Sequence, residues 1–132
     1  MKVIDSSSIA KYVNREQSWE AAAKALGESC ISLELAVIET GSSLLKRVRA
    51  GEIDDKQAQQ IFSEFVTARP FMIADREELY APAIEIATTL GLSLYDALFL
   101  ALAKAKDFQL VTSDSSQAEA AKKLGLEVQF IE

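Results

Sequence analysis

The chain has 132 residues, 49% of them hydrophobic, which is typical of a single domain with a sizeable core. It has no histidine and one cysteine, Cys30, which excludes a histidine general base, the usual zinc ligands and an internal disulfide. The formal net charge of -6 argues against a broad phosphate-binding surface. No apolar run reaches the roughly 20 residues that span a bilayer, and residues 1–5 break off too early for a signal peptide, so we expect a cytoplasmic protein.

The first half of the chain alternates short apolar runs with amphipathic stretches. Lys2–Ile4 is a short strand, and Asp5–Ser8 supplies a turn and cap before a helix over Glu16–Leu26. Asp54 with Gln57 forms a capping-box pattern at the start of a later helix. The remaining elements expected here are a strand over Cys30–Ser32, a helix over Leu33–Ala50, a helix that begins at Asp54 and stops at Arg69-Pro70, and a strand over Phe71–Ala74.

The second half continues the alternation. Asp75 with Glu78 repeats the capping-box pattern before a helix that ends at Gly91, and Leu94–Ala105 is apolar nearly all round, as in a buried helix. A strand over Gln109–Thr112, a helix over Ser116–Leu124 and a strand over Glu127–Ile131 follow. Strands this short and apolar, alternating with helices, predict an α/β fold: a three-layer α/β/α sandwich with a central parallel sheet of about five strands.

Four carboxylates occupy corresponding positions in this pattern. Asp5 and Asp114 stand at the ends of strands, whereas Glu39 and Asp96 lie in the first turns of predicted helices. In an open α/β sheet the ligand site lies beyond the carboxyl ends of the strands, where the connections diverge to opposite faces. Ionised carboxylates gathered there repel one another unless a cation compensates. The spacing therefore predicts a divalent-metal site, for which Mg2+ or Mn2+ suits the oxygen ligands.

Each acid also fits a plain structural role. Asp5 and Asp114 have the positions of helix N-caps, and Glu39 fits a solvated helix face. Asp96 completes a capping box with Ser93, but it enters a helix that we expect to be buried, where a charge without a partner is strongly unfavourable. Taken singly, these alternatives stay open; the common placement of the four acids favours the metal site.

One basic cluster stands out in this acidic chain. Lys46, Arg47 and Arg49 lie at the end of the helix predicted over Leu33–Ala50. Cations at a helix C-terminus complement the helix dipole, and this is the structural explanation of the cluster. Local binding of phosphate groups is the functional alternative.

The acidic segments resemble those of the PIN domain and, within it, of the VapC-type toxins of bacterial and archaeal toxin–antitoxin pairs. Val3–Ser7 is similar to the opening acidic strand, and Glu39-Thr40 to the helical acid. Leu92–Ala97 resembles the most recognisable segment of the family, and Leu110–Asp114 resembles its closing Thr-x-Asp strand. The resemblance covers essentially the whole chain and implies a single PIN domain over residues 1–132.

The resemblance implies a metal-dependent endoribonuclease. Its catalytic, metal-binding acids would be Asp5, Glu39, Asp96 and Asp114, and its polar support would be Ser7 and Thr112. Bound Mg2+ or Mn2+ would activate a water molecule and stabilise the leaving oxygen during hydrolysis of an RNA phosphodiester bond. Some members carry a further acid after the last strand, where this chain has Ser115 and Ser116, so four ligands support one metal better than two.

The resemblance also implies partners. These are an RNA substrate, a VapB-type antitoxin that can place an arginine in the acidic site, and a second copy of the chain in a homodimer. The helices that bear Trp19 and Phe62 are candidate surfaces for the antitoxin or the second copy, with core packing as the alternative use. No stretch of the sequence has the pattern of a base-stacking platform or an RNA-recognition motif.

Other function classes fit the residues less well. A catalytically silent PIN-like scaffold and an RNA-processing nuclease without an antitoxin would keep the same fold. A phosphoacceptor receiver domain, which also binds Mg2+, would use Asp75 after the third strand, but no lysine follows the final strand. A phosphatase of the haloacid-dehalogenase type needs an Asp-x-Asp pair at the first strand, where this chain has Asp5-Ser6-Ser7.

Overall fold

Five short strands form one parallel sheet in the computed structural model, which describes residues 1–132. The strands are β1 (Lys2–Ile4), β2 (Cys30–Ser32), β3 (Met72–Ile73), β4 (Gln109–Thr112) and β5 (Val128–Phe130). Their order is β3-β2-β1-β4-β5, so β1 is central, and Val3 pairs with Ile31 on one side and Leu110 on the other. The predicted parallel sheet of five strands is confirmed.

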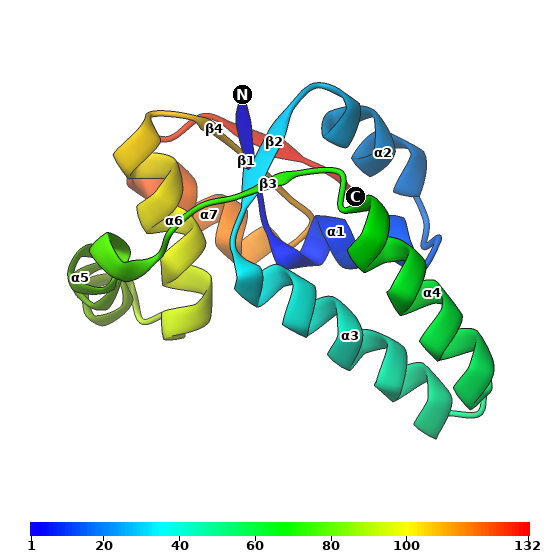
Figure 1. The fold of residues 1–132 in the computed structure, drawn as a ribbon. Coiled ribbons are helices and arrows are strands. Elements are labelled where there is room, and N and C mark those ends of the chain that lie inside the picture. The colour runs from blue at the N-terminus through cyan, green and yellow to red at the C-terminus, as the bar shows by residue number, and fades with distance from the viewer.

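Helices cover both faces of this sheet. They are α1 (Ser6–Val13), α2 (Trp19–Gly27), α3 (Glu34–Arg49), α4 (Asp55–Ala68), α5 (Tyr80–Leu90), α6 (Leu94–Lys106) and α7 (Ser115–Lys123). Figure 1 shows α1 to α4 on one side of the strands and α5 to α7 on the other. The connections from β1 and β2 run towards one edge of the sheet, whereas the later ones return towards the opposite edge, which places the two sets of helices on opposite faces. The expected three-layer sandwich is therefore confirmed.

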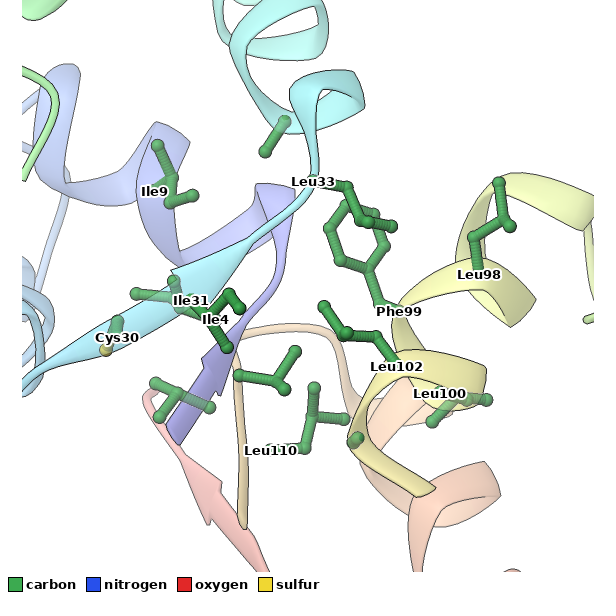
Figure 2. Packing of buried hydrophobic residues seen from close by; sticks show 14 of the residues in the cluster. Ile4, Ile9, Cys30, Ile31, Leu33, Leu98, Phe99, Leu100, Leu102 and Leu110 are labelled. Carbon is green, nitrogen blue, oxygen red and sulfur yellow. The ribbon is translucent and has the colours of Figure 1, made fainter. Parts of the chain in front are cut away.

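The core lies on both faces of the sheet, and α6 contributes the longest buried run to it. The segment Ala97–Ala103 of α6 is buried without interruption, as its apolar sequence predicted. Figure 2 shows Phe99 and Leu102 pointing from α6 towards the strands that carry Ile4 and Ile31. A helix buried at this depth fixes its first turn firmly, which matters because Asp96 lies there.

No single helix is long and apolar enough to cross a membrane. Only the pair Glu77–Leu90 and Leu94–Lys106 has the combined length and composition, and its two parts are bent by 116°.

The region after Asp5 differs from the prediction. We expected a turn over Asp5–Ser8 before a helix starting at Glu16, but α1 begins at Ser6 and α2 only at Trp19. Serines favour caps and turns over helix interiors, so the three serines at the start of α1 did not indicate a helix. The Asp5 carboxylate caps α1 by accepting a hydrogen bond from Ser8 N (3.4 Å).

The expected capping boxes formed unequally. The box of Asp54 and Gln57 is complete, with both reciprocal hydrogen bonds. Asp75 instead accepts from Glu77 N (3.1 Å), and a short 3-10 turn, η1 (Glu77–Leu79), precedes α5, so the box predicted with Glu78 is wrong. An aspartate side chain can accept a hydrogen bond from the backbone N–H two residues ahead as readily as from the one three residues ahead. Asp75 forms the former contact, an Asx-type turn, in place of the capping box.

Helices α3 and α4 pack against each other as an antiparallel pair that extends away from the sheet (Figure 1). A Cβ atom at Gly41 of α3 would lie 3.0 Å from Phe62 Cε1 of α4. Glycine therefore permits the close approach of the two helices at this point, despite its cost in a helix interior. Beside this contact runs an apolar groove of about 520 Å3, the α3–α4 groove, whose wall includes Ile38, Leu45 and Phe62.

Candidate active site

The four predicted acids line one cavity beyond the carboxyl ends of β1 and β4. These two strands are neighbours, and their connections leave to opposite faces of the sheet, so a crevice opens between them. The cavity has a volume of about 240 Å3 and is lined by Asp5, Ser6, Ser7, Ala10, Glu39, Asp96, Phe99 and Asp114. We call it the acidic cavity. The topology thus brings together residues that lie far apart in the sequence.

Asp5 is the most buried of the acids, with 4% of its surface exposed. Its Oδ1 accepts a hydrogen bond from Ser7 Oγ (2.6 Å), and its Oδ2 accepts one from Thr112 Oγ1 (2.6 Å). Burial opposes the charged form more strongly than these bonds favour it, and it raises the pKa of Asp5 from 3.8 to about 6. The negative charge of Asp96 acts in the same direction.

Asp114 caps the first turn of α7. Its Oδ1 accepts hydrogen bonds from Ser116 Oγ (2.7 Å), Ser116 N (2.9 Å) and Gln117 N (3.3 Å). The bond from the Ser116 hydroxyl, followed by those from the backbone, holds the pKa of Asp114 below its ordinary value against the opposing effect of burial. Asp114 therefore keeps its charge more readily than Asp5 or Asp96.

Asp96 lies in the first turn of the buried helix α6. Burial and the nearby negative charge of Asp114 raise the pKa of Asp96, while the hydrogen bond with Ser93 opposes them. Ser93 Oγ accepts from Asp96 N (3.1 Å), which is one half of the predicted capping box. Gln117 Nε2 donates to the Asp96 carbonyl oxygen (2.9 Å), so α7 also holds this turn in place.

Glu39 reaches the acidic cavity from α3. It is half-buried, and its Oε1 accepts a hydrogen bond from Ser6 Oγ (2.6 Å) at the start of α1. The prediction left open whether Glu39 lies on a solvated helix face. The structure places Glu39 on the wall of the acidic cavity and not on a helix face that only contacts solvent.

Hydroxyl groups join the two strand ends beneath the acids. Ser7 and Thr112, predicted as polar support, both donate to Asp5 and lie 3.3 Å apart. Ser7 Oγ also accepts from Ser113 N (2.9 Å), and Thr112 Oγ1 accepts from Asp114 N (3.1 Å). These contacts link the start of α1 to the end of β4 and fix the position of Asp5.

Sequence reasoning missed four polar partners in this region: Ser6, Ser8, Ser113 and Gln117. Ser8 Oγ and Ser113 Oγ lie 2.8 Å apart, although the two residues are separated by 105 positions in the sequence. The run of three serines after Asp5 is the available signal, although the pattern by itself predicts only a turn and a cap. Hydroxyl residues beside a predicted acid therefore merit inspection as its hydrogen-bond donors.

The chemistry of the donor set fits a divalent cation. The lining contains four carboxylates and no lysine or arginine, and burial, with a smaller contribution from a neighbouring aspartate, raises the pKa of Asp5 and of Asp96. The arrangement is not that of a loaded site, since no group of three or more acidic side chains is positioned to hold one ion. Three of the carboxylates accept hydrogen bonds from hydroxyl groups, and acidic side chains must move closer together to hold one ion.

Comparisons with known proteins agree with this architecture. The curated protein Ribonuclease VapC3 from Pyrobaculum aerophilum is 28% identical over 120 residues, which cover 89% of this chain and 92% of that protein. The crystal structure of PAE2754 from Pyrobaculum aerophilum superposes with a TM-score of 0.73 and 22% identity, over 96% of this chain and 89% of that chain. A toxin–antitoxin complex from Klebsiella pneumoniae gives a TM-score of 0.58 and 15% identity, over 87% of this chain and 88% of that chain.

The two solved structures share the fold of this chain at low sequence identity. The family model of the PIN domain matches residues 2–123, which is nearly the full length. The resemblance inferred from Asp5, Glu39, Asp96 and Asp114 is thereby confirmed at the level of the family, and the chain belongs to the PIN domain family.

Proposed function

We propose that this chain is a metal-dependent endoribonuclease and the VapC-type toxin of a toxin–antitoxin pair. The observation that carries the proposal is the acidic cavity, which four carboxylates and no cationic side chain line at the point where the strand connections diverge. The match to the PIN domain and the similarity to Ribonuclease VapC3 support RNA as the substrate.

In this proposal Asp5, Glu39, Asp96 and Asp114 hold the cation and face the scissile phosphate. A divalent cation bound there would supply Lewis-acid activation of water and charge stabilisation at the phosphate. Thr112 and Ser7 orient both oxygens of Asp5, so this carboxylate has a defined direction before any ligand arrives. Preorganised ligands of this kind lower the cost of assembling a site.

Hydrogen bonds and burial determine which acids of the cavity hold a proton. Asp114 stays ionised because three donors stabilise its charge, whereas burial makes Asp5 and Asp96 more ready to hold a proton. A cation that binds here must displace any such proton, since only carboxylates coordinate it well. Metal binding and RNA cleavage should therefore weaken as the pH falls towards the pKa of Asp5, about 6.

We also propose an antitoxin of VapB type as partner, supported by the structural similarity to a toxin–antitoxin complex. Phe62 lines the α3–α4 groove, so this groove is the candidate antitoxin surface on α4. Trp19 is instead half-buried beneath the Arg15 side chain, so it offers less free surface. A homodimer and a cytoplasmic location remain parts of the proposal, and light scattering of the purified chain tests the first of them.

The test is cleavage of a fluorophore-labelled single-stranded RNA by purified protein, with Mg2+ or Mn2+ and then with excess chelator. We expect cleavage only with metal, and none from the double variant Asp5→Asn/Asp96→Asn purified in parallel. The double variant controls for contaminating nuclease, and circular dichroism checks that it folds. Equal cleavage by the wild type and the double variant would remove the site assignment.

A catalytically silent PIN-like scaffold is the second candidate. The observation that favours it is the absence of any three acids grouped closely enough to hold one ion in this arrangement. The two candidates differ in metal binding. Isothermal titration with Mn2+ should give a saturable signal for a nuclease that is lost in Asp96→Asn, and no signal for a silent scaffold.

A further inference from the structure

Two further cavities lead away from the acidic cavity along α3. The first, the connecting cavity, has a volume of about 350 Å3 and shares Glu39 with the acidic cavity. The second, the arginine cavity, has a volume of about 460 Å3 and shares Ser43 with the connecting cavity. Because neighbouring cavities share a wall residue at each step, the three form one path over the surface.

One face of α3 supplies the floor of this path. Its residues at intervals of three and four are Glu39, Ser42, Ser43, Lys46 and Arg47. Such positions lie on the same side of an α-helix. The rise of 1.5 Å per residue puts Arg47 about 12 Å along the axis from Glu39. This face therefore runs from a carboxylate of the proposed catalytic site to a cluster of cations.

The two arginines of the arginine cavity are held in place by neutral groups. Arg47 Nη1 donates to Asn14 Oδ1 (2.9 Å). Arg15 Nη1 donates to the Tyr12 carbonyl oxygen (2.6 Å), and its guanidinium lies 4.2 Å from the centre of the Trp19 ring. Neutral partners orient a guanidinium without cancelling its charge, so both groups stay available to an anion.

The acidic groups near these cations are few and solvent-exposed. Glu16 and Glu52 also line the arginine cavity, and Glu52 Oε1 lies 3.9 Å from Arg47 Nε. With 28% and 58% of their side chains exposed, Arg47 and Glu52 form a contact that water and salt screen strongly. Lys46, which lines the connecting cavity, forms no salt bridge. The basic cluster thus has free charge beyond its contribution to the helix dipole.

An exposed aromatic ring lies at the start of the path. Tyr95 lines the connecting cavity, directly precedes Asp96 in the chain, and has 61% of its surface exposed. A tyrosine this exposed offers a flat face on which a base of single-stranded RNA can stack. The sequence alone showed no stacking platform, because a single tyrosine carries no pattern until its position beside the site is known.

We propose that the connecting and arginine cavities bind single-stranded RNA on one side of the phosphate to be cleaved. Tyr95 stacks a base next to the acidic cavity, and Lys46, Arg47 and Arg15 bind a flanking phosphate. The length of α3 between Glu39 and Arg47 keeps the arginines away from the scissile phosphate itself. This inference rests on the ribonuclease function proposed above. It implies that the bound RNA extends from the acidic cavity along α3 to the arginine cavity.

The test compares two substrates, a dinucleotide and a longer single-stranded oligoribonucleotide. For Arg47→Gln we expect KM for the longer RNA to rise about tenfold, the effect of losing one charge-assisted hydrogen bond, while kcat changes little. The dinucleotide cannot reach the arginine cavity, so its kcat/KM should not change. The salt dependence of binding to the longer RNA should become less steep by about 0.7 for each phosphate that the variant no longer neutralises.

Four further variants complete the test. Arg49→Gln removes the same charge from the same helix end but touches none of the three cavities, so it should leave KM for the longer RNA unchanged. Glu52→Gln frees Arg47 from its only carboxylate and should lower this KM. Tyr95→Ala should raise KM for the longer RNA, whereas Tyr95→Phe, which keeps the ring face, should not.

Equal effects of Arg47→Gln on both substrates, or equal effects of Arg47→Gln and Arg49→Gln, would overturn the inference while leaving the nuclease in place. A wild-type protein that cleaves neither substrate with Mg2+ or Mn2+ would overturn the proposed function itself, and the inference with it. Thermal unfolding of each variant separates loss of binding from loss of fold.

Discussion

The β1–α1 and β4–α7 junctions are built alike, yet their aspartates behave differently. Each strand is followed by an aspartate that caps the next helix, and each aspartate has serines beside it. The two strands are neighbours in the sheet. Nevertheless the pKa of Asp5 is raised to about 6, whereas the pKa of Asp114 is lowered.

The difference comes from burial and from the number of donors. Asp5 lies beneath the surface, where the loss of water outweighs its hydrogen bonds from Ser7 and Thr112. Asp114 is more open, and Ser116 donates to it through both its hydroxyl and its backbone. Two junctions with the same local sequence pattern therefore supply two carboxylates with different affinities for protons.

The largest expected effect tests whether both junctions serve one site. Asp5→Asn and Asp114→Asn should each lower RNA cleavage by more than about a hundredfold, because each removes a proposed metal ligand. The measurement is kcat/KM with Mn2+ under conditions where the wild type is active. Glu119→Gln, an exposed position on α7, is the matched control. Wild-type activity in either aspartate variant would separate that junction from the site.

The pH dependence of stability tests the environment of Asp5. Its pKa in the folded state, about 6, lies above its ordinary value of 3.8, so the folded protein holds this proton more tightly than the unfolded chain. The associated stability is present in full below about pH 4 and is lost as the pH rises through 6, by up to about 3 kcal/mol. Asp5→Asn should abolish this loss and raise the free energy of unfolding at neutral pH.

Urea unfolding of the wild type and Asp5→Asn at several pH values measures this difference. Asp114→Asn should show no such gain at neutral pH. The lowered pKa of Asp114 means that its charged form stabilises the folded protein at neutral pH, and this stability is lost as the pH falls. Equal gains in Asp5→Asn and Asp114→Asn would contradict the difference between the junctions.

Ser7→Ala should have an intermediate effect. Ser7 donates to Asp5 Oδ1 and accepts from Ser113 N, so its loss leaves Asp5 Oδ1 with only the longer bond from Ser8 N and leaves Ser113 N without this acceptor. We expect a loss of about 1–3 kcal/mol in the free energy of unfolding and a further rise in the pKa of Asp5. The acid limb of the cleavage profile should therefore move to higher pH. Ser7→Thr, which keeps the hydroxyl, should restore part of both quantities.

Ser116→Ala should have the smallest effect. The variant loses the hydroxyl bond to Asp114, but the backbone donors of residue 116 and Gln117 remain. The expected cost in stability is less than about 1 kcal/mol. NMR titration of the carboxyl carbon should show the pKa of Asp114 moving up towards its ordinary value. An unchanged pKa would mean that the hydroxyl is not the main cause of the shift.

The fold was largely predictable because its strongest signals are local. The strand Gln109–Thr112 has an apolar centre, and the helix that follows Ser93 is apolar and buried without interruption over Ala97–Ala103. The convergence of the four acids followed from the general topology of parallel sheets. Helix α1 was not predictable in the same way, because Ser6, Ser7 and Ser8 weaken the local preference for helix.

The details of the site depend on contacts between distant residues. Ser7 and Ser113 are 106 positions apart and still share a hydrogen bond. No local pattern indicates such a partner, nor the burial that raises the pKa of Asp5. The sequence therefore indicated which residues carry the charge, while tertiary packing decides how firmly each one holds a proton.

Helix α3 has consequences for how this chain can evolve. Glu39, Ser43 and Arg47 line the path to the acidic cavity, whereas Leu45 and Val48 line only the α3–α4 groove on another side of the helix. A substitution on one side leaves the other side chemically unaltered, since their side chains point in different directions. Selection can therefore change what docks in the groove, generation after generation, while the catalytic side of the same helix is inherited unchanged.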